Sequence, residues 1–156
     1  MTRRHTMAAL LLTLVGLFTI VSPLLADYNA THLFNPRWTP HARFHGAHTM
    51  SMGILLGAAT LFFTWRRRGE RWRSLAIATG FGSIYWVAQL MATQFPTVGL
   101  MDPEFDLPSS YLLGIPINIF ANVIVLALLA IVGAVIASAA NAGAREVGTF
   151  RPSGQR

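Results

Sequence analysis

Residues 115–137 read IPINIFANVIVLALLAIVGAVIA, a stretch without a single charged side chain. A helix needs about 20 predominantly apolar residues to cross roughly 30 Å of hydrocarbon, so this stretch is long enough to span a bilayer. Three further stretches meet the same criterion, at residues 7–25, about 46–65 and about 74–94. We therefore predict an all-α fold, a polytopic membrane bundle of four helices.

The composition of the whole chain agrees with this prediction. Of the 156 residues, 53% are hydrophobic and only 12% are charged, which is about half the charge of an average soluble protein. The mean hydropathy is +0.49. There is no cysteine, so the sequence excludes disulfides, cysteine-ligated metal centres and thiol nucleophiles.

The net charge of +6 does not indicate a nucleic-acid partner. All 12 basic residues are arginines, and they lie in short clusters between the apolar stretches rather than on one patch or stripe of a folded surface. The partner that this pattern predicts is the lipid bilayer.

The arginines also predict the orientation. Ten of them fall on one side of the four spans: Arg3, Arg4, Arg66, Arg67, Arg68, Arg71, Arg73, Arg145, Arg151 and Arg156. The other side carries only Arg37 and Arg43. Because cytoplasmic loops carry the arginine excess, we expect both termini in the cytoplasm, with residues 27–45 and 95–114 on the outer side of the cell membrane.

We expect one transmembrane domain over residues 1–144 and a flexible cytoplasmic tail over 145–156. Residues 1–26 also resemble a secretory signal peptide, whose cleavage would leave three spans and an outer N-terminus. Leu24 stands where a small residue is preferred and Pro23 lies close to the site, so we expect this segment to be retained.

Small residues favour close packing of the spans. Gly53 and Gly57 have GxxxG spacing, which lets helix backbones approach each other in lipid. This spacing supports a compact bundle, and it leaves open a homo-oligomer or a place in a larger membrane complex.

The stretch at residues 31–50, THLFNPRWTPHARFHGAHTM, holds four of the five histidines. Thr39 followed by Pro40 is typical of a helix start, so we predict a helix from about Pro40 to Trp65, roughly 39 Å long. His41, His45 and His48 then share one face of that helix, whereas His32 lies off it and is the weakest candidate.

These three histidines have three interpretations. They are solvated residues at a helix end, or ligands of a zinc or iron ion together with an outer carboxylate, or groups that transfer protons or grip a ligand without metal. We carry His41, His45 and His48 forward as candidate catalytic residues and candidate metal ligands.

Polar residues from the other three spans are expected at the same depth: Asp27, Tyr85, Gln89, Asn118 and Asn122. Because polar groups in a bilayer face the bundle interior or a water-filled cavity, this convergence predicts a polar pocket that opens outward. In it, Tyr85, Gln89, Asn118 and Asn122 would bind a substrate, and Asp27 would set the tautomer of a histidine. The two asparagines also fit simple hydrogen bonds between helices.

The motif NPRW at residues 35–38, followed by PHARFH at residues 40–45, resembles a family of small four-span membrane proteins of unknown function found in bacteria and fungi. The chain is also loosely similar, in span number and intramembrane polar residues, to emopamil-binding-like and anthrone-oxygenase-like bundles. That similarity implies a lipophilic substrate, by analogy of architecture alone.

The sequence therefore favours a membrane protein whose outward histidine-lined pocket handles a lipophilic small molecule, with or without a divalent metal, as a metal-dependent or acid–base enzyme. The alternative is a non-enzymatic accessory subunit of a larger membrane complex. A small transporter is less favoured, because four short spans leave little room for alternating access.

Overall fold

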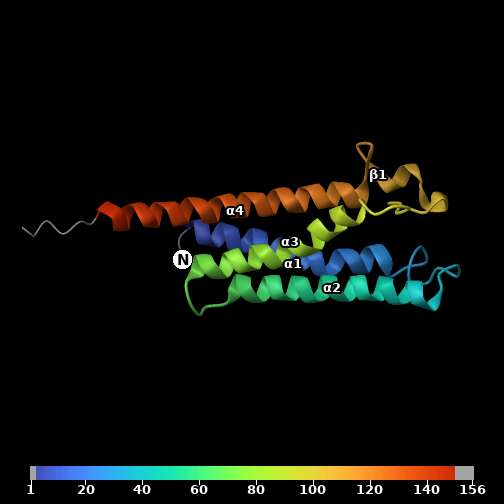
Figure 1. The fold of residues 1–156 in the computed structure, drawn as a ribbon, viewed down its shortest axis with the longest axis horizontal. Coiled ribbons are helices and arrows are strands. Elements are labelled where there is room, and N and C mark those ends of the chain that lie inside the picture. The colour runs from blue at the N-terminus through green and yellow to red at the C-terminus, as the bar shows by residue number, and fades with distance from the viewer. Residues whose placement is uncertain (1–2, 150–156) are drawn as a thin grey trace, which may run out of the picture.

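The computed structural model describes residues 3–149, and within them it has four long helices (Figure 1). These are α1 (Arg3–Asp27), α2 (Pro40–Trp65), α3 (Arg71–Ala92) and α4 (Ile117–Thr149). Each is long and apolar enough to cross a membrane, in α4 over the part Ile117–Ala139. The predicted all-α bundle of four spans is thus confirmed for the described residues.

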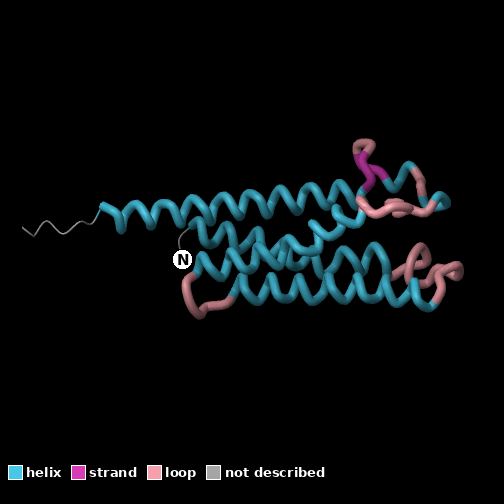
Figure 2. Tube along the Cα trace, in the orientation of Figure 1, coloured by secondary structure: helices cyan, strands magenta, loops and turns pink. Residues whose placement is uncertain are grey.

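The connections between the helices divide the bundle into two ends. The start of α1, the turn at residues 66–70 and the final turns of α4 lie at the same end, where α4 extends past the other helices (Figure 1). We call this the arginine-rich end. The α1–α2 connection and the α3–α4 connection lie at the opposite end, which we call the loop end (Figure 2).

The predicted start of α2 is confirmed in detail. Pro40 is its first residue, and the Thr39 hydroxyl accepts a hydrogen bond from the backbone N–H of Ala42 at 3.2 Å. The backbone N–H groups of the first helical turn have no carbonyl partner within the helix. Proline lacks such an N–H, and the threonine side chain accepts a hydrogen bond from another of them. The helix then continues without interruption to Trp65, as predicted.

Two helix ends differ from the predicted spans. Helix α3 ends at Ala92 rather than Gln94, because the Thr93 and Gln94 N–H groups bond to carbonyls three residues back, in a tightened last turn. Helix α4 continues to Thr149, so the division expected after residue 144 falls inside it. The rest of the expected flexible tail, residues 150–156, lies outside the described residues.

The α3–α4 connection contains structure that the sequence analysis did not predict. Two short 3₁₀ turns, Pro103–Phe105 and Pro108–Ser110, precede a small hairpin of β1 (Tyr111–Leu112) and β2 (Ile115–Pro116) (Figure 2). The Tyr111 hydroxyl donates a 2.6 Å hydrogen bond to Asp106 Oδ1, and this bond raises the pKa of Tyr111.

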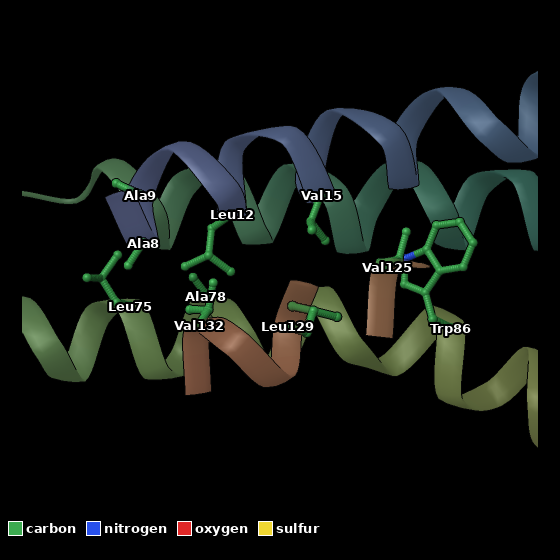
Figure 3. Close-up of a cluster of buried hydrophobic side chains, with 10 residues drawn as sticks. All are labelled: Ala8, Ala9, Leu12, Val15, Leu75, Ala78, Trp86, Val125, Leu129 and Val132. Carbon is green, nitrogen blue, oxygen red and sulfur yellow. The ribbon is translucent and has the colours of Figure 1, made fainter. Parts of the chain in front are cut away.

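The buried core lies between α1, α3 and α4 (Figure 3). Its members are mostly aliphatic: Ala8, Ala9, Leu12, Val15, Leu75, Ala78, Trp86, Val125, Leu129 and Val132. Many large apolar side chains instead face outward along the spans, among them Leu14 and Phe62, each more than half exposed. A lipid environment accounts for such extensive apolar exposure on regular helices.

Helices α1 and α2 approach each other closely at glycines. A Cβ atom on Gly57 would stand 2.5 Å from the backbone oxygen of Gly16, and one on Gly53 would stand 2.6 Å from Pro23 Cγ. The GxxxG motif is therefore used inside the chain, where it brings the first two spans together.

We expect Gly57→Ala to destabilise the bundle by about 1–3 kcal/mol, because the added methyl group meets the Gly16 backbone oxygen as well as the Ile20 side chain, and the backbone cannot turn aside. Gly80→Ala is the matched control, since nothing lies within 4 Å of a Cβ atom at that position. Unfolding of the detergent-solubilised protein, followed by circular dichroism, measures both. Equal stability of the two variants would contradict the close contact.

Candidate binding cavity at the loop end

A cavity of about 960 Å³ lies at the loop end of the bundle. Its walls come from the ends of α1 and α3, the beginnings of α2 and α4, and both loop-end connections. Ligand cavities in proteins commonly measure about 300–1,000 Å³, so this one is large enough for a sizeable small molecule. We call it the loop-end cavity.

The lining of the loop-end cavity combines apolar and polar side chains. Met52, Leu56, Ile84 and Ala88 of α2 and α3 contribute apolar surface. Polar groups come from all four helices and from the connections: Asp27, His32, His48, Tyr85, Gln89 and Asn118. A cavity with both kinds of lining suits a molecule that has a hydrocarbon part and a polar group.

Asp27 and His32 form the closest acid–base pair of this lining. Asp27 Oδ1 lies 3.7 Å from His32 Nε2, and the two side chains are 18% and 42% exposed, respectively. The other ring nitrogen, Nδ1, lies 2.7 Å from the Thr31 hydroxyl oxygen. The pair is thus partly shielded from solvent, and the His32 ring has a polar neighbour at each of its two nitrogens.

The hydrogen bonds of Thr31 indicate where the protons of His32 lie. The Thr31 hydroxyl donates its only hydrogen to Asn29 Oδ1 at 2.6 Å, because an amide oxygen can only accept. Its lone pairs therefore face His32, whose Nδ1 must donate. Nε2 then faces the Asp27 carboxyl at 3.7 Å, which is within the range of an ion pair but beyond that of a hydrogen bond.

A turn after α1 brings His32 back towards Asp27. The Asn29 side chain accepts from the Thr31 N–H at 2.8 Å and donates to the Ala26 carbonyl at 2.7 Å. The Leu33 N–H then bonds to the Asp27 carbonyl at 3.0 Å. Asparagine side chains commonly form such turns, and this one ends the helix while it reverses the chain.

The NPRW motif gives the α1–α2 connection its shape. Asn35 is 2% exposed, donates to the Thr31 carbonyl at 3.2 Å and accepts from the Arg37 N–H at 2.9 Å. Its own carbonyl accepts from Arg43 Nη2 at 3.1 Å. The Trp38 ring centroid lies 5.3 Å from that of His32. The motif therefore supports the segment that carries His32.

An ion pair links the two loop-end connections. Arg37 Nη2 of the first contacts Glu104 Oε1 of the second, and both side chains are partly exposed. Residues next to each partner, Trp38 and Phe105, line the cavity. The ion pair therefore joins two of the segments that enclose it.

A buried polar chain connects the cavity with the core. The Asn122 side chain is fully buried and donates to the Trp86 carbonyl at 2.8 Å and to Gln89 Oε1 at 2.9 Å. Trp86 Nε1 donates to the buried Thr19 hydroxyl at 2.9 Å. These bonds join α1, α3 and α4 and hold Gln89 by its carbonyl oxygen, while its amide N–H groups have no hydrogen-bond partner among the described residues.

The structure brings some of the predicted site residues together and separates others. Asp27, His48, Tyr85, Gln89 and Asn118 line the loop-end cavity, and Asn122 lies behind Gln89. His41 and His45 do not line it, and their side chains contact each other at an exposed position. Among the side chains that the structure describes, those of residues 3–139, no group of three or more histidines, aspartates or glutamates is arranged to hold a metal ion.

His32 is the cavity residue that the sequence analysis ranked lowest. Its position outside the helix that carries His41, His45 and His48 makes it the weakest candidate among the histidines of residues 31–50. The signal that points to it is the turn-forming Asn29 only two residues after the end of α1, which returns the chain to the helix end.

The fold defines the class of this molecule, a multi-pass membrane protein of four helices. Its family is one step more specific: the chain belongs to DUF6640, a family of unknown function, whose model matches residues 11–141. The predicted resemblance to an uncharacterised family is thus confirmed. No curated protein and no solved structure matches the chain.

We expect Asn122→Ala to destabilise the protein by about 1–3 kcal/mol, because it leaves the buried Trp86 carbonyl and the partly buried Gln89 oxygen without their donor. Asn118→Ala is the matched control: that side chain is half-buried, its one hydrogen bond is to the N–H of Ile119, and its loss should cost less than about 0.5 kcal/mol. Thermal unfolding in detergent compares the two. Similar losses would contradict the structural role of Asn122.

We expect His32 to carry a proton on Nδ1 at neutral pH. Nitrogen NMR of protein labelled with ¹⁵N-histidine reports which ring nitrogens are protonated, and His32→Gln assigns the signal. Thr31→Val should remove the preference for Nδ1, because it replaces the accepting hydroxyl with a methyl group. A neutral ring protonated only at Nε2 in the parent protein would refute the arrangement.

Proposed function

We propose that this protein binds a lipophilic small molecule that carries a polar end group, and that the loop-end cavity is the binding site. The observation that carries the proposal is the composition of the cavity lining, where aliphatic side chains and hydrogen-bonding side chains share about 960 Å³. In a protein surrounded by lipid, molecules with a hydrocarbon part are the ligands that reach such a site at high local concentration.

The polar end group would lie against Tyr85, Gln89 and the Asp27–His32 pair. Gln89 offers free amide donors because Asn122 occupies only its carbonyl oxygen. The hydrocarbon part would lie against Met52, Leu56 and Ile84. A cavity with one polar and one apolar side favours a ligand with a hydroxyl, carbonyl or carboxyl group over a pure hydrocarbon. A pure hydrocarbon would displace water from the polar side chains without replacing the hydrogen bonds that they lose.

The Asp27–His32 pair would serve acid–base chemistry on the bound molecule. An imidazole exchanges protons near neutral pH, and a carboxylate beside it stabilises the protonated ring. The acid–base role that the sequence predicts for His41, His45 and His48 thus passes in this proposal to His32. Of those three only His48 lines the cavity, where it would contact the ligand.

We also infer that the arginine-rich end faces the cytoplasm and that the protein resides in the cell membrane. The turn between α2 and α3 carries Arg66, Arg67 and Arg68, whereas the loop end has two arginines, of which Arg37 is paired with Glu104. The arginine excess favours this orientation. The loop-end cavity would then be reached from the outer half of the bilayer or from the outer side.

Photolabelling tests the binding proposal. Detergent-purified protein is incubated with a diazirine-bearing long-chain fatty alcohol, irradiated and mapped by peptide mass spectrometry. We expect labels on the peptides that carry Met52 and Ile84, and competition by the unlabelled alcohol. Ala88→Trp, which places an indole in the cavity lining, should reduce labelling about tenfold, equivalent to ~1.4 kcal/mol of binding.

Ala76→Trp provides the matched control for the added indole. Ala76 belongs to the same helix, is also exposed, and does not line the cavity, so this variant should be labelled like the parent. Labelling spread evenly over the lipid-facing surface, or unchanged in Ala88→Trp, would overturn the proposed function.

A further inference from the structure

Two exposed imidazoles approach each other at the start of α2. His45 Nε2 lies 3.1 Å from His41 Nε2, and the ring planes are nearly perpendicular, with centroids 4.6 Å apart. The residues are one helical turn apart, so the helix itself holds both Cβ atoms at neighbouring positions. Neither ring lines the loop-end cavity.

This pair lies in the first two turns of α2, a helix that is longer than the hydrocarbon layer needs. Helix α2 has 26 residues and a length of about 39 Å, compared with roughly 30 Å of hydrocarbon. His41 is its second residue, and both histidine side chains are exposed. With the surplus length of α2 at the loop end, the two exposed Nε2 atoms would face water.

The separation of the two nitrogens matches that of two ligands on one metal ion. Metal–nitrogen bonds of about 2.0–2.1 Å place neighbouring ligands about 2.9 Å apart at a right angle and about 3.4 Å apart at a tetrahedral angle. The observed 3.1 Å lies between these values. In the hydrogen bond one of the two Nε2 atoms carries the hydrogen; on metal binding that ring would move its hydrogen to Nδ1, so that both Nε2 lone pairs bind the ion.

We propose that His41 and His45 form a two-histidine site for a borderline divalent metal ion, with Cu²⁺ bound more tightly than Zn²⁺. Imidazole nitrogen suits both ions, and Cu²⁺ stands highest in the general order of affinities. The described residues provide no third ligand, so water completes the coordination. His48 is not a ligand, because it lines the cavity.

This site is independent of the proposed function, since it shares no residue with the Asp27–His32 pair. An ion at His41 and His45 would lie on the helix that continues into the cavity wall at His48 and Met52. The inference concerns metal binding by the free protein and requires no ligand in the cavity.

Titration of the full chain with Cu²⁺ tests the site, with a purification tag that contains no histidine. Electron paramagnetic resonance should show one Cu²⁺ per chain with two coordinating imidazole nitrogens. His41→Ala and His45→Ala should each weaken binding about 100-fold, because the remaining imidazole loses the benefit of chelation. Zn²⁺ should compete for the same site.

His48→Ala is the matched control, because it removes a third histidine of the same helix and leaves the pair intact. Its Cu²⁺ affinity should stay within about threefold of the parent. Affinity that survives in His41→Ala, or that falls equally in His48→Ala, would overturn the two-histidine site. Since these positions are exposed, unchanged thermal unfolding of each variant separates ligand loss from misfolding.

Discussion

The close approach of α1 and α2 is the constraint on which the loop end depends. No Cβ atom fits at Gly57, where the backbone oxygen of Gly16 would stand 2.5 Å away, and Pro23 fills the space beside Gly53. Lipid provides no hydrophobic force that drives helices together, so contact at this distance supplies the packing energy. Asp27 lies one turn beyond Pro23, and the contact therefore sets where that carboxyl stands relative to the cavity wall of α2.

The opposite wall is held by hydrogen bonds rather than by backbone contact. In the low dielectric of a membrane bundle, hydrogen bonds between helices stabilise one arrangement, because any shift leaves a buried donor unpaired; Asn122 is paired here through its amide nitrogen, and its Oδ1 has no partner among the described residues. Trp86 and Asn122 form a chain of these bonds among α1, α3 and α4. The same chain fixes Gln89 at the edge of the cavity. Gln89, which would contact a ligand, is thus positioned by Asn122, which does not line the cavity.

The sequence was sufficient to predict the features that arise from local patterns. The number of spans follows from uninterrupted apolar stretches, and the start of α2 follows from Thr39 and Pro40. It was not sufficient for features that depend on where the chain turns. His32 reaches Asp27 through a turn organised by Asn29 and Asn35, and the hairpin near residue 113 contains a non-glycine residue with positive φ, Leu113 at 54°. Hydrophobic periodicity carries no information about either.

The same distinction explains why the histidines fall into two separate places. His41 and His45 meet because a helix brings residues one turn apart together, which spacing alone predicts. His48 continues the same face one turn further along α2, and there it lines the cavity together with residues of α3. A ligand in the cavity would therefore meet one histidine from the helix and one from the turn after α1. The proposed proton transfer and the proposed metal binding would thus use different imidazoles, although all of them come from one short stretch of sequence.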